Sequence, residues 1–462
     1  MAKRHDRRPR LGLVSLGCAK NEVDAERILG AAAEAGWLIC ADPADADAVV
    51  VNTCAFIHAA REESLAALRG ALALKRRGRC KAVVVAGCLA QRLGRELRHE
   101  LPEVDAWVGL AGARDVPRIA AALLRNRGEP ALHIEPLAPT FGEEGSRLRI
   151  TPRHYAYLRI AEGCENRCAY CAIPLIRGPL RSKPLETCLE EARQLADDGC
   201  RELILIAQDT TNYGLDLTGR RELPRLLDRL AGLEAFHWLR VLYSHPAHFD
   251  DATLEAFATT PHLCHYVDIP VQHASDRILE RMGRGTTRQA MADLVGRLRR
   301  RIPDVVLRTT VLVGYPGETE ADFEALLGFI RGAAFERLGA FAYSPERGTR
   351  AEAQGPAVPE AERQARLDEV MRAQQPIAFR HNARRVGERT EVVVDAALGP
   401  GRFEARSTAE APDVDGVVRL EAEKLEPGSF VEVRITQADG YDLEARARSP
   451  ATRGEDRHGP TA

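Results

Sequence analysis

The first part of the chain alternates short apolar runs with longer amphipathic segments. Leu11–Leu16, Ala48–Asn52 and Lys81–Ala86 are mostly apolar runs with the length and composition of buried strands. Each run is followed by a segment in which apolar residues recur with helical spacing. Strands that alternate with helices in this way form a parallel sheet covered by helices. The pattern therefore predicts an α/β domain over residues 10–124.

The same alternation returns after a break and continues through the middle of the chain. It predicts a second α/β domain over residues 151–383, which ends in a long amphipathic helix from Pro359 to Asn382. Six strand–helix units are too few for a closed eight-unit barrel, so we expect an open, partial (βα)6 barrel of the TIM type. The six expected strands are Tyr155–Ile160, Glu202–Ala207, Trp238–Tyr243, Tyr266–Val271, Val305–Val313 and Leu338–Tyr343.

Near the C-terminus the pattern changes to short strands interrupted by Gly, Pro and Asp. Over residues 384–448 it predicts a small five-stranded β-barrel of the OB type. Residues 125–150, rich in Pro, Gly and charge, are expected to be a linker. Residues 449–462 and the basic N-terminal leader have the composition of disordered segments. The expected barrel strands are Glu391–Ala396, Phe403–Arg406, Gly416–Leu420, Phe430–Thr436 and Tyr441–Ala445.

Composition and charge narrow the class of protein. The 462 residues include 65 Lys and Arg against 67 Asp and Glu, a net charge of −2, so no overall attraction to a polyanion is indicated. Eleven cysteines, an odd number, do not have the spacing of a secreted disulfide framework. No apolar run reaches the roughly 18 residues that a membrane span needs, and no signal-peptide core follows the N-terminus. We therefore expect a cytoplasmic protein without membrane contact.

Three cysteines, Cys164, Cys168 and Cys171, form a C-x3-C-x2-C run on one short predicted loop. Three thiolates can hold three irons of a four-iron cluster and leave the fourth iron free to bind a small molecule. Such an open position is typical of a catalytic metal site. A structural zinc loop is the alternative, but it needs a fourth ligand, and the nearest upstream histidine is His154. The spacing therefore favours an iron–sulfur cluster.

A second set of cysteines becomes visible only when the predicted sheet is considered. Cys18, Cys54 and Cys88 each follow one of the first three predicted strands. Because neighbouring parallel strands end at the same edge of a sheet, these thiols are expected to lie together, close to helix N-termini that favour an anionic site. A single cysteine at such a position is most often a small buried apolar residue. Three at equivalent positions predict a second cluster with one free iron.

The sequence around these cysteines resembles the methylthiotransferase family of radical S-adenosylmethionine (SAM) enzymes. LGCAKN, VNTCAFI and AGCLAQR, around Cys18, Cys54 and Cys88, are similar to the three motifs of the family's N-terminal domain. RHYAYLRIAEGCENRCAYC, AQDTTNYG, DIPVQHAS and VGYPGET are similar to its radical SAM core, and residues 387–448 resemble its TRAM domain. The resemblance covers the chain from about residue 10 to residue 448.

This resemblance implies a radical mechanism with two [4Fe-4S] clusters and SAM as cofactors. The C-x3-C-x2-C cysteines would be catalytic: their cluster would take an electron from an external donor and cleave SAM. The resulting 5′-deoxyadenosyl radical would remove hydrogen from an unactivated carbon. Cys18, Cys54 and Cys88 would hold the second cluster, which carries sulfur supplied by a donor. A second SAM would supply the methyl group.

The family has one branch that modifies a tRNA adenosine and another that modifies the β-carbon of an aspartate in small-subunit ribosomal protein twelve. HYAYLRIAEGC, DIPVQHAS and APDVDG are similar to the ribosomal-protein branch. YSHP (243–246) and the pair Glu346-Arg347 depart from that branch, but they leave the thiol motifs unchanged. The resemblance implies a ribosomal protein as substrate, free or in the small subunit, with a tRNA adenosine methylthiotransferase as the alternative.

The charge of the last predicted domain is an independent indication of the substrate. Residues 387–448 contain 8 Lys and Arg against 14 Asp and Glu, a net charge of −6. Proteins bind nucleic acid mainly through cations placed against phosphates. An acidic barrel suits a basic ribosomal protein better, although surface charge can also serve solubility alone. We therefore expect no direct tRNA binding.

Polar residues at the C-terminal ends of the barrel strands are expected to face SAM and the substrate. They are Gln208, Asp209, Ser244, Gln272 and Tyr343. Gln208 and Asp209 could instead cap a helix or form a turn, and Gln272 could satisfy a buried backbone group. A non-catalytic iron–sulfur electron carrier or scaffold is the alternative of another class. Such a protein needs neither a long barrel nor an open iron, so the sequence favours an enzyme.

Overall fold

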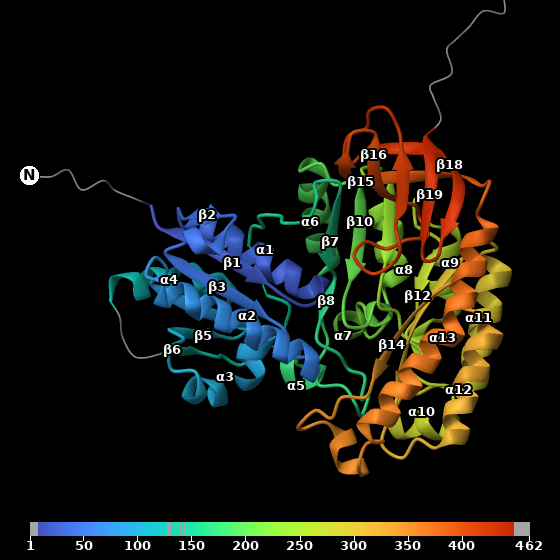
Figure 1. The fold of residues 1–462 in the computed structure, drawn as a ribbon, viewed down its shortest axis with the longest axis horizontal. Helices are drawn as coiled ribbons and strands as arrows, with labels where there is room; N and C mark the ends of the chain where they lie inside the picture. Colours follow the sequence, from blue (N-terminus) through green and yellow to red (C-terminus); the bar gives the residue numbers. More distant parts are fainter. Residues whose placement is uncertain (1–7, 127–130, 139, 143–144, 448–462) are drawn as a thin grey trace, which may run out of the picture.

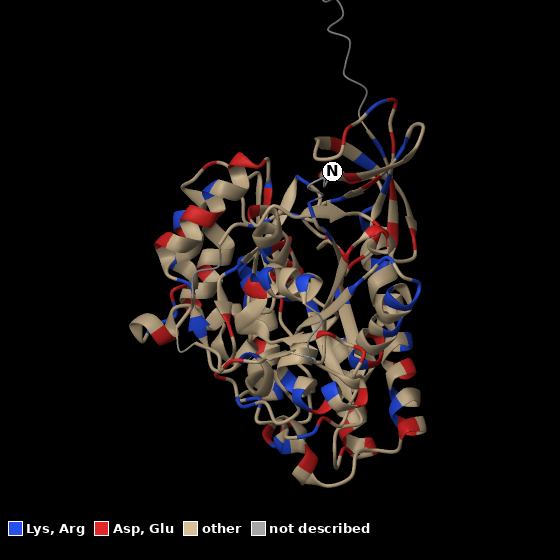
Figure 2. Cartoon of the chain, turned by 90° about the vertical axis from the view of Figure 1, so that its left-hand side faces the viewer, with Lys and Arg blue, Asp and Glu red and all other residues tan. Residues whose placement is uncertain are grey.

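The structure is a computed structural model, which describes residues 8–126, 131–138, 140–142 and 145–447. The segment predicted as a tail (449–462) and most of the basic leader lie outside the described residues. Figure 1 shows a blue N-terminal region of sheet and helices, a green-to-orange half-barrel and a red C-terminal barrel. In Figure 2, acidic and basic residues are interspersed over all three regions. Within the described ranges, no helix is long and apolar enough to cross a membrane.

The N-terminal region is a six-stranded parallel sheet in the order β2-β1-β3-β4-β5-β6. Its central strands, β3 (Ala48–Thr53) and β4 (Ala82–Gly87), are buried along their whole length, because helices cover both faces of their valine runs. The other elements are β1 (Arg10–Ser15), β2 (Leu38–Cys40), β5 (Ala106–Val108), β6 (Ala131–His133), α1 (Ala19–Glu34), α2 (His58–Arg76), α3 (Cys88–Glu100) and α4 (Val116–Arg125).

The segment 125–150, expected to be a linker, is partly built into the fold. Its residues 131–133 form β6, which pairs with β5 and is too short to give a periodic signal in the sequence. Further along, the Arg147 guanidinium pairs with Glu26 of α1 and, at 2.6 Å, with Glu191 of the half-barrel. The expectation of a simple linker is therefore wrong for these residues. They pack against the N-terminal sheet and connect it to the half-barrel through ion pairs.

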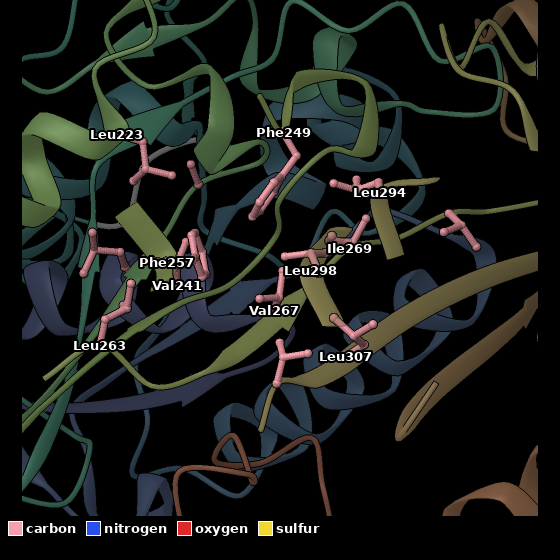
Figure 3. Packing of buried hydrophobic residues seen from close by; sticks show 14 of the residues in the cluster. Leu223, Val241, Phe249, Phe257, Leu263, Val267, Ile269, Leu294, Leu298 and Leu307 are labelled. Atoms are coloured by element: carbon pink, nitrogen blue, oxygen red, sulfur yellow. The ribbon is translucent and has the colours of Figure 1, made fainter. Parts of the chain in front are cut away.

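The middle region is an open half-barrel of parallel strands, in two sheets ordered β11-β10-β7 and β12-β13-β14. A bridge between Leu239 and Leu263 joins the two sheets, so the predicted partial barrel of six βα units is confirmed. Figure 3 shows the apolar packing between strands and outer helices. The strands are β7 (Tyr155–Arg159), β10 (Glu202–Ile206), β11 (Trp238–Val241), β12 (Tyr266–Asp268), β13 (Val306–Val313) and β14 (Arg337–Ala342). The helices are α6 (Leu185–Asp197), α7 (Leu215–Thr218), α8 (Leu223–Ala231), α9 (Asp251–Thr259), α10 (Asp276–Met282), α11 (Arg288–Arg301), α12 (Glu320–Ala333) and α13 (Glu360–Arg384).

The C-terminal region is a closed barrel in the order β15-β16-β17-β19-β18, as predicted. Every second side chain along the strands is apolar and points into the interior. This alternation is typical of strands with one buried face. The parallel pair β17–β19 distinguishes this barrel from a simple meander. Its strands are β15 (Arg389–Gly399), β16 (Arg402–Arg406), β17 (Val418–Glu421), β18 (Phe430–Asp439) and β19 (Asp442–Ala447).

Buried ion pairs fix the C-terminal barrel to the half-barrel. The Arg406 guanidinium pairs with Glu202 of β10 at 2.8 Å and with Asp395 of β15 at 2.7 Å. Arg240 of β11 pairs with the same Glu202 at 2.7 Å, and both of these side chains are fully buried. Removing one partner of a buried pair leaves an uncompensated charge, at a cost of about 3–5 kcal/mol. The small barrel is therefore held in one position on the core.

Candidate active site

The C-x3-C-x2-C loop follows β7 and the short strand β8 (Ala161–Glu162), at the C-terminal end of the half-barrel. Gly163 begins the loop with φ +73°, and a Cβ there would lie 1.9 Å from a carbonyl oxygen, so only glycine fits. The Ala169 N–H donates to the carbonyl of Met282 at 2.7 Å. All three thiols of this loop are half-buried. We call Cys164, Cys168 and Cys171 the loop triad.

Asp209, which follows β10, is the centre of a polar network beside the loop triad. It accepts hydrogen bonds from Asn166 at 2.7 Å, from His248 Nδ1 at 2.8 Å and from Asn212 at 3.0 Å. Burial would raise the pKa of the Asp209 carboxyl, but the bond from His248 and the nearby histidine charges outweigh burial and lower the pKa to about 2. A charged and fully bonded Asp209 holds Asn166, a residue of the cysteine loop, in place.

The other four residues expected to face SAM lie at strand ends, in different surroundings. The buried hydroxyls of Ser244 and Tyr343 have no hydrogen-bond partner among the described residues. Gln208 donates to Glu162 at 3.2 Å. Gln272 has φ +69° and joins β13 through a bridge made by its backbone. The Gln208 Oε1 also has no hydrogen-bond partner among the described residues. Contact between any of the four and SAM stays a prediction.

Arg284 is a residue of this site that sequence reasoning missed. Its buried guanidinium donates to the Cys168 Sγ at 3.5 Å. Burial would lower the pKa of Arg284, but Tyr170 and Cys168 raise it, so the side chain stays charged. Gly283, just before it, has φ +64° and ends α10 against the cysteine loop. The only signal in the sequence is the Gly-Arg-Gly that ends this helix, and it says nothing about the thiols.

The structure brings Cys18, Cys54 and Cys88 to one edge of the N-terminal sheet, as the strand pattern predicts. They follow β1, β3 and β4, which are neighbouring parallel strands. The backbone next to Cys18 lies close to the Cys54 thiol: a Cβ on Gly17, where φ is +100°, would lie 3.3 Å from the Cys54 Sγ. Burial raises the pKa of the Cys88 thiol to about 12, and the charges of Cys18 and Cys54 add to this effect. We call these three cysteines the strand-end triad.

Arg177 connects the two triads and is a second residue that the sequence did not indicate. It ends α5 (Ile173–Arg177), the helix that follows the loop triad directly. Its guanidinium donates to the Cys88 Sγ at 3.4 Å and pairs with Asp24 of α1 at 2.8 Å and with Glu162 at 2.7 Å. Burial would lower the pKa of Arg177, but Cys88 and the two carboxylates raise it well above its usual value. A fixed cation therefore lies between the two regions.

Cys18 differs electrostatically from the other thiols of its triad. It keeps contact with solvent, although protein atoms surround its thiol on most sides and disfavour the thiolate. The charges of Lys20 and Arg177 outweigh this effect and lower the pKa of Cys18. The strand-end triad thus contains one thiol that ionises more readily than an ordinary cysteine.

The donors at both triads fit iron–sulfur clusters. Thiolates are the ligands that such clusters prefer, and each triad has a buried guanidinium beside it that offsets negative charge. In the part of the chain that the structure describes, no three Cys, His, Asp or Glu side chains are placed to share one metal ion. A structural zinc loop would need such a group. In a four-iron cluster each thiolate binds a different iron, so the thiols need not converge on one point.

Comparison with known proteins defines the class. Residues 158–330 match the radical SAM superfamily, residues 10–109 match the uncharacterized protein family UPF0004, and residues 386–447 match the TRAM domain. The fold is similar to that of TsrM, a radical SAM methyltransferase from Kitasatospora setae, with a TM-score of 0.52 at 15% identity over 85% of this chain and 80% of TsrM. Fold, thiol motif and family match together define a radical SAM enzyme.

Close relatives narrow the class further. The chain is 44% identical to the ribosomal protein uS12 methylthiotransferase RimO of Symbiobacterium thermophilum, over 96% of this chain and 92% of the relative. It is 43% identical to RimO of Desulforamulus reducens, over 94% and 98% respectively. The chain therefore belongs to the RimO family of radical SAM methylthiotransferases. The predicted family and enzyme class are confirmed, as are SAM and iron–sulfur cofactors at the level of the family. These relatives support neither a tRNA-directed enzyme nor a non-catalytic carrier.

Proposed function

We propose that this chain places a methylthio group on the β-carbon of an aspartate in ribosomal protein uS12. Relatives that match almost the whole chain carry this substrate in their names. The observation that supports two-cluster chemistry most directly is the position of Arg177. It extends from the helix after the loop triad to the Cys88 thiol of the strand-end triad. The two sets of thiols therefore belong to elements that contact each other, as sulfur transfer between them and one substrate requires.

In this proposal each triad holds one [4Fe-4S] cluster. Cys164, Cys168 and Cys171 would hold the cluster that binds SAM, and this pair would supply the radical chemistry needed at a carbon with no acidic proton. The chain's own residues orient the cysteine loop: Asp209 holds Asn166 of the loop, and Arg284 keeps a cation beside Cys168. The hydroxyls of Ser244 and Tyr343 are available to bind SAM or the substrate.

The substrate assignment agrees with the charge of the C-terminal barrel. With 8 Lys and Arg against 14 Asp and Glu over residues 387–448, this domain is a poor partner for RNA phosphates and a suitable one for a basic ribosomal protein. We propose that the protein acts in the cytoplasm, where ribosomal proteins are made. An external reductant supplies the electron, and a separate donor restores the sulfur.

The test compares cells with and without this gene, grown under conditions in which clusters form. Intact masses of all ribosomal proteins are recorded, and total tRNA is digested for modified nucleosides. The proposal predicts the loss of one methylthio group from uS12 alone, with tRNA unchanged. Loss from a tRNA adenosine would leave the radical chemistry in place but would refute the ribosomal substrate and the interpretation of the acidic barrel.

A further inference from the structure

Lys20, the second residue of α1, is largely buried and makes no ion pair with a carboxylate among the described residues. Its side chain is only 7% exposed, and its ammonium lies 3.2 Å from the centroid of the Tyr243 ring. Among the described residues, no carboxylate, carbonyl or hydroxyl lies within hydrogen-bonding distance of this ammonium. The cation–π contact holds the ammonium over the ring without neutralising its charge. No carboxylate of the described residues therefore occupies this ammonium.

The two neighbours of Lys20 place it between the sulfur-carrying region and the half-barrel. Lys20 follows Cys18 of the strand-end triad by two residues, and its charge lowers the pKa of that thiol. Tyr243 follows β11 and precedes Ser244, on the face of the half-barrel where SAM is expected. The Lys20 ammonium thus lies between the strand-end triad and the half-barrel, where a substrate that contacts both would bind.

Tyr243 is held in an unusual backbone conformation at this point. Its φ is +65°, in the left-handed region that costs a non-glycine residue about 1–3 kcal/mol. Its N–H donates to Asp268 at 2.9 Å, and its carbonyl accepts from the Thr210 N–H at 3.1 Å. These bonds over-determine the backbone, so the ring is fixed as a platform for the Lys20 ammonium.

The nearest acidic side chain in the sequence does not serve as the missing anion. Glu22 makes no ion pair with Lys20, and burial together with Glu26 and Asp413 raises the pKa of Glu22 to about 7. The other carboxylates of α1 that form ion pairs do so with arginines, as Asp24 does with Arg177 and Glu26 with Arg147.

We propose that the Lys20 ammonium binds the side-chain carboxylate of the acceptor aspartate and so selects aspartate over asparagine. This inference rests on the proposed function. The β-carbon that receives sulfur must lie between the strand-end triad and the half-barrel, and its carboxylate is one bond away. A compact ammonium at that position fixes the carboxylate through charge-assisted hydrogen bonds. In this proposal Lys20 is a specificity and positioning group that contacts the carboxylate and takes no part in the radical chemistry.

The test uses the full chain with both clusters reconstituted, in four forms: wild type, Lys20→Met, Lys20→Arg and the control Lys81→Met. Lys81 is exposed and precedes β4, whereas Cys88 follows that strand, so this control removes a lysine at the opposite end of the sheet. Each form is given uS12 with the acceptor aspartate and uS12 with asparagine in its place. Binding is measured by fluorescence anisotropy and modification by intact mass.

We expect the wild type and Lys81→Met to bind the aspartate form at least about 10-fold more tightly than the asparagine form. Lys20→Met should reduce this ratio to about one, and Lys20→Arg should restore part of it. SAM cleavage without uS12, which depends on the loop triad, should not change. The unfolding midpoint of Lys20→Met should change little, because no carboxylate loses an ion-pair partner.

Two results would overturn the inference. If Lys20→Met keeps the preference for aspartate, Lys20 does not bind the carboxylate. If Lys20→Met loses iron from the strand-end triad while the preference for aspartate persists, the ammonium stabilises the cluster and does not select the substrate. Failure of the wild type to modify uS12 would instead refute the proposed function, and this result is visible without any variant.

Discussion

The two cysteine triads offer the same three thiols but are assembled in different ways. The loop triad is formed within residues 164–171, by one turn that Gly163 and the end of α10 hold in shape. The strand-end triad collects residues spread from 18 to 88, and it forms only when β1, β3 and β4 pair in register. A metal-binding sequence motif therefore reports the first kind of site directly, whereas the second kind is a property of the sheet.

The triads also differ in their electrostatic surroundings. Burial raises the pKa of Cys164 and of Cys171 to about 12, with one guanidinium, that of Arg284, nearby. At the strand-end triad Lys20 and Arg177 act together and lower the pKa of Cys18 despite its enclosure. The strand-end triad thus has one thiol with a lowered pKa, whereas burial raises the pKa of its other two thiols, Cys54 and Cys88.

The largest expected effects are those of cysteine substitutions, which should differ between the two triads. Cys164→Ala should abolish SAM cleavage and therefore all product, because the loop triad cannot hold a cluster with two thiols. Cys54→Ala should abolish sulfur insertion but keep SAM cleavage within about two-fold of the wild-type rate. Chromatography of 5′-deoxyadenosine together with intact mass of uS12 measures both. Sulfur insertion by the Cys54→Ala protein would disprove the assignment of roles.

Arg177→Met should break the connection between the triads. The substitution leaves Asp24 and Glu162 without their shared cation in a buried site, which should lower the free energy of unfolding by about 3–5 kcal/mol. Arg118→Met is the matched control, since Arg118 pairs with Asp115 on the surface and should cost less than about 1 kcal/mol. Equal costs for the two variants in denaturant unfolding would show that Arg177 does not link the regions.

Two glycine substitutions should damage the triads one at a time. Gly163→Ala places a Cβ 1.9 Å from a carbonyl oxygen and should displace the loop triad. Gly17→Ala places one 2.9 Å from the Cys54 Cβ and should displace the strand-end triad. Each also strains a backbone with positive φ, at a cost of about 1–3 kcal/mol. Iron analysis should show a partial loss in each variant, and loss of both clusters from either one would contradict independent assembly.

A change in the C-terminal barrel should leave both triads intact. Glu410 pairs with Arg385 at 2.6 Å and with Arg337 at 2.9 Å, and these cations outweigh burial and lower its pKa to about 2. Its stabilising effect is present above its unfolded pKa of about 4.3 and is lost as the pH falls towards 2. Glu410→Gln should cost about 1–3 kcal/mol at neutral pH, and this difference should shrink below about pH 4. A difference that persisted in acid would show that Glu410 is not a charged anchor.

Most of the fold could be predicted from the sequence, because its strands and helices have strong periodic signals. The valine runs of β3 and β4 and the six strands of the half-barrel are found where the pattern places them. Strands β2, β5 and β6 could not be found, because each has only three residues and depends on a neighbour for pairing. The ion pairs of Arg147 could not be predicted for a related reason: they join residues that are distant in the sequence.

The thiols of the site could be predicted, but the charges around them could not. The spacing of the loop triad is visible in the sequence, and the strand-end triad follows once the sheet is assumed. Arg177, Arg284 and Lys20 act through positions reached only in three dimensions, and nothing in the local sequence distinguishes them from surface cations. Asp209 was correctly placed at a strand end, but its bonds make it a support for Asn166 of the cysteine loop.

The central claim, that two separate triads each hold a cluster, is tested most directly by counting iron. Wild-type protein is compared with one variant in which Cys18, Cys54 and Cys88 are all alanine and another in which Cys164, Cys168 and Cys171 are. We predict about eight irons per chain in the wild type and about four in each variant after reconstitution. A variant that keeps all the wild-type iron, or loses all of it, would contradict the account.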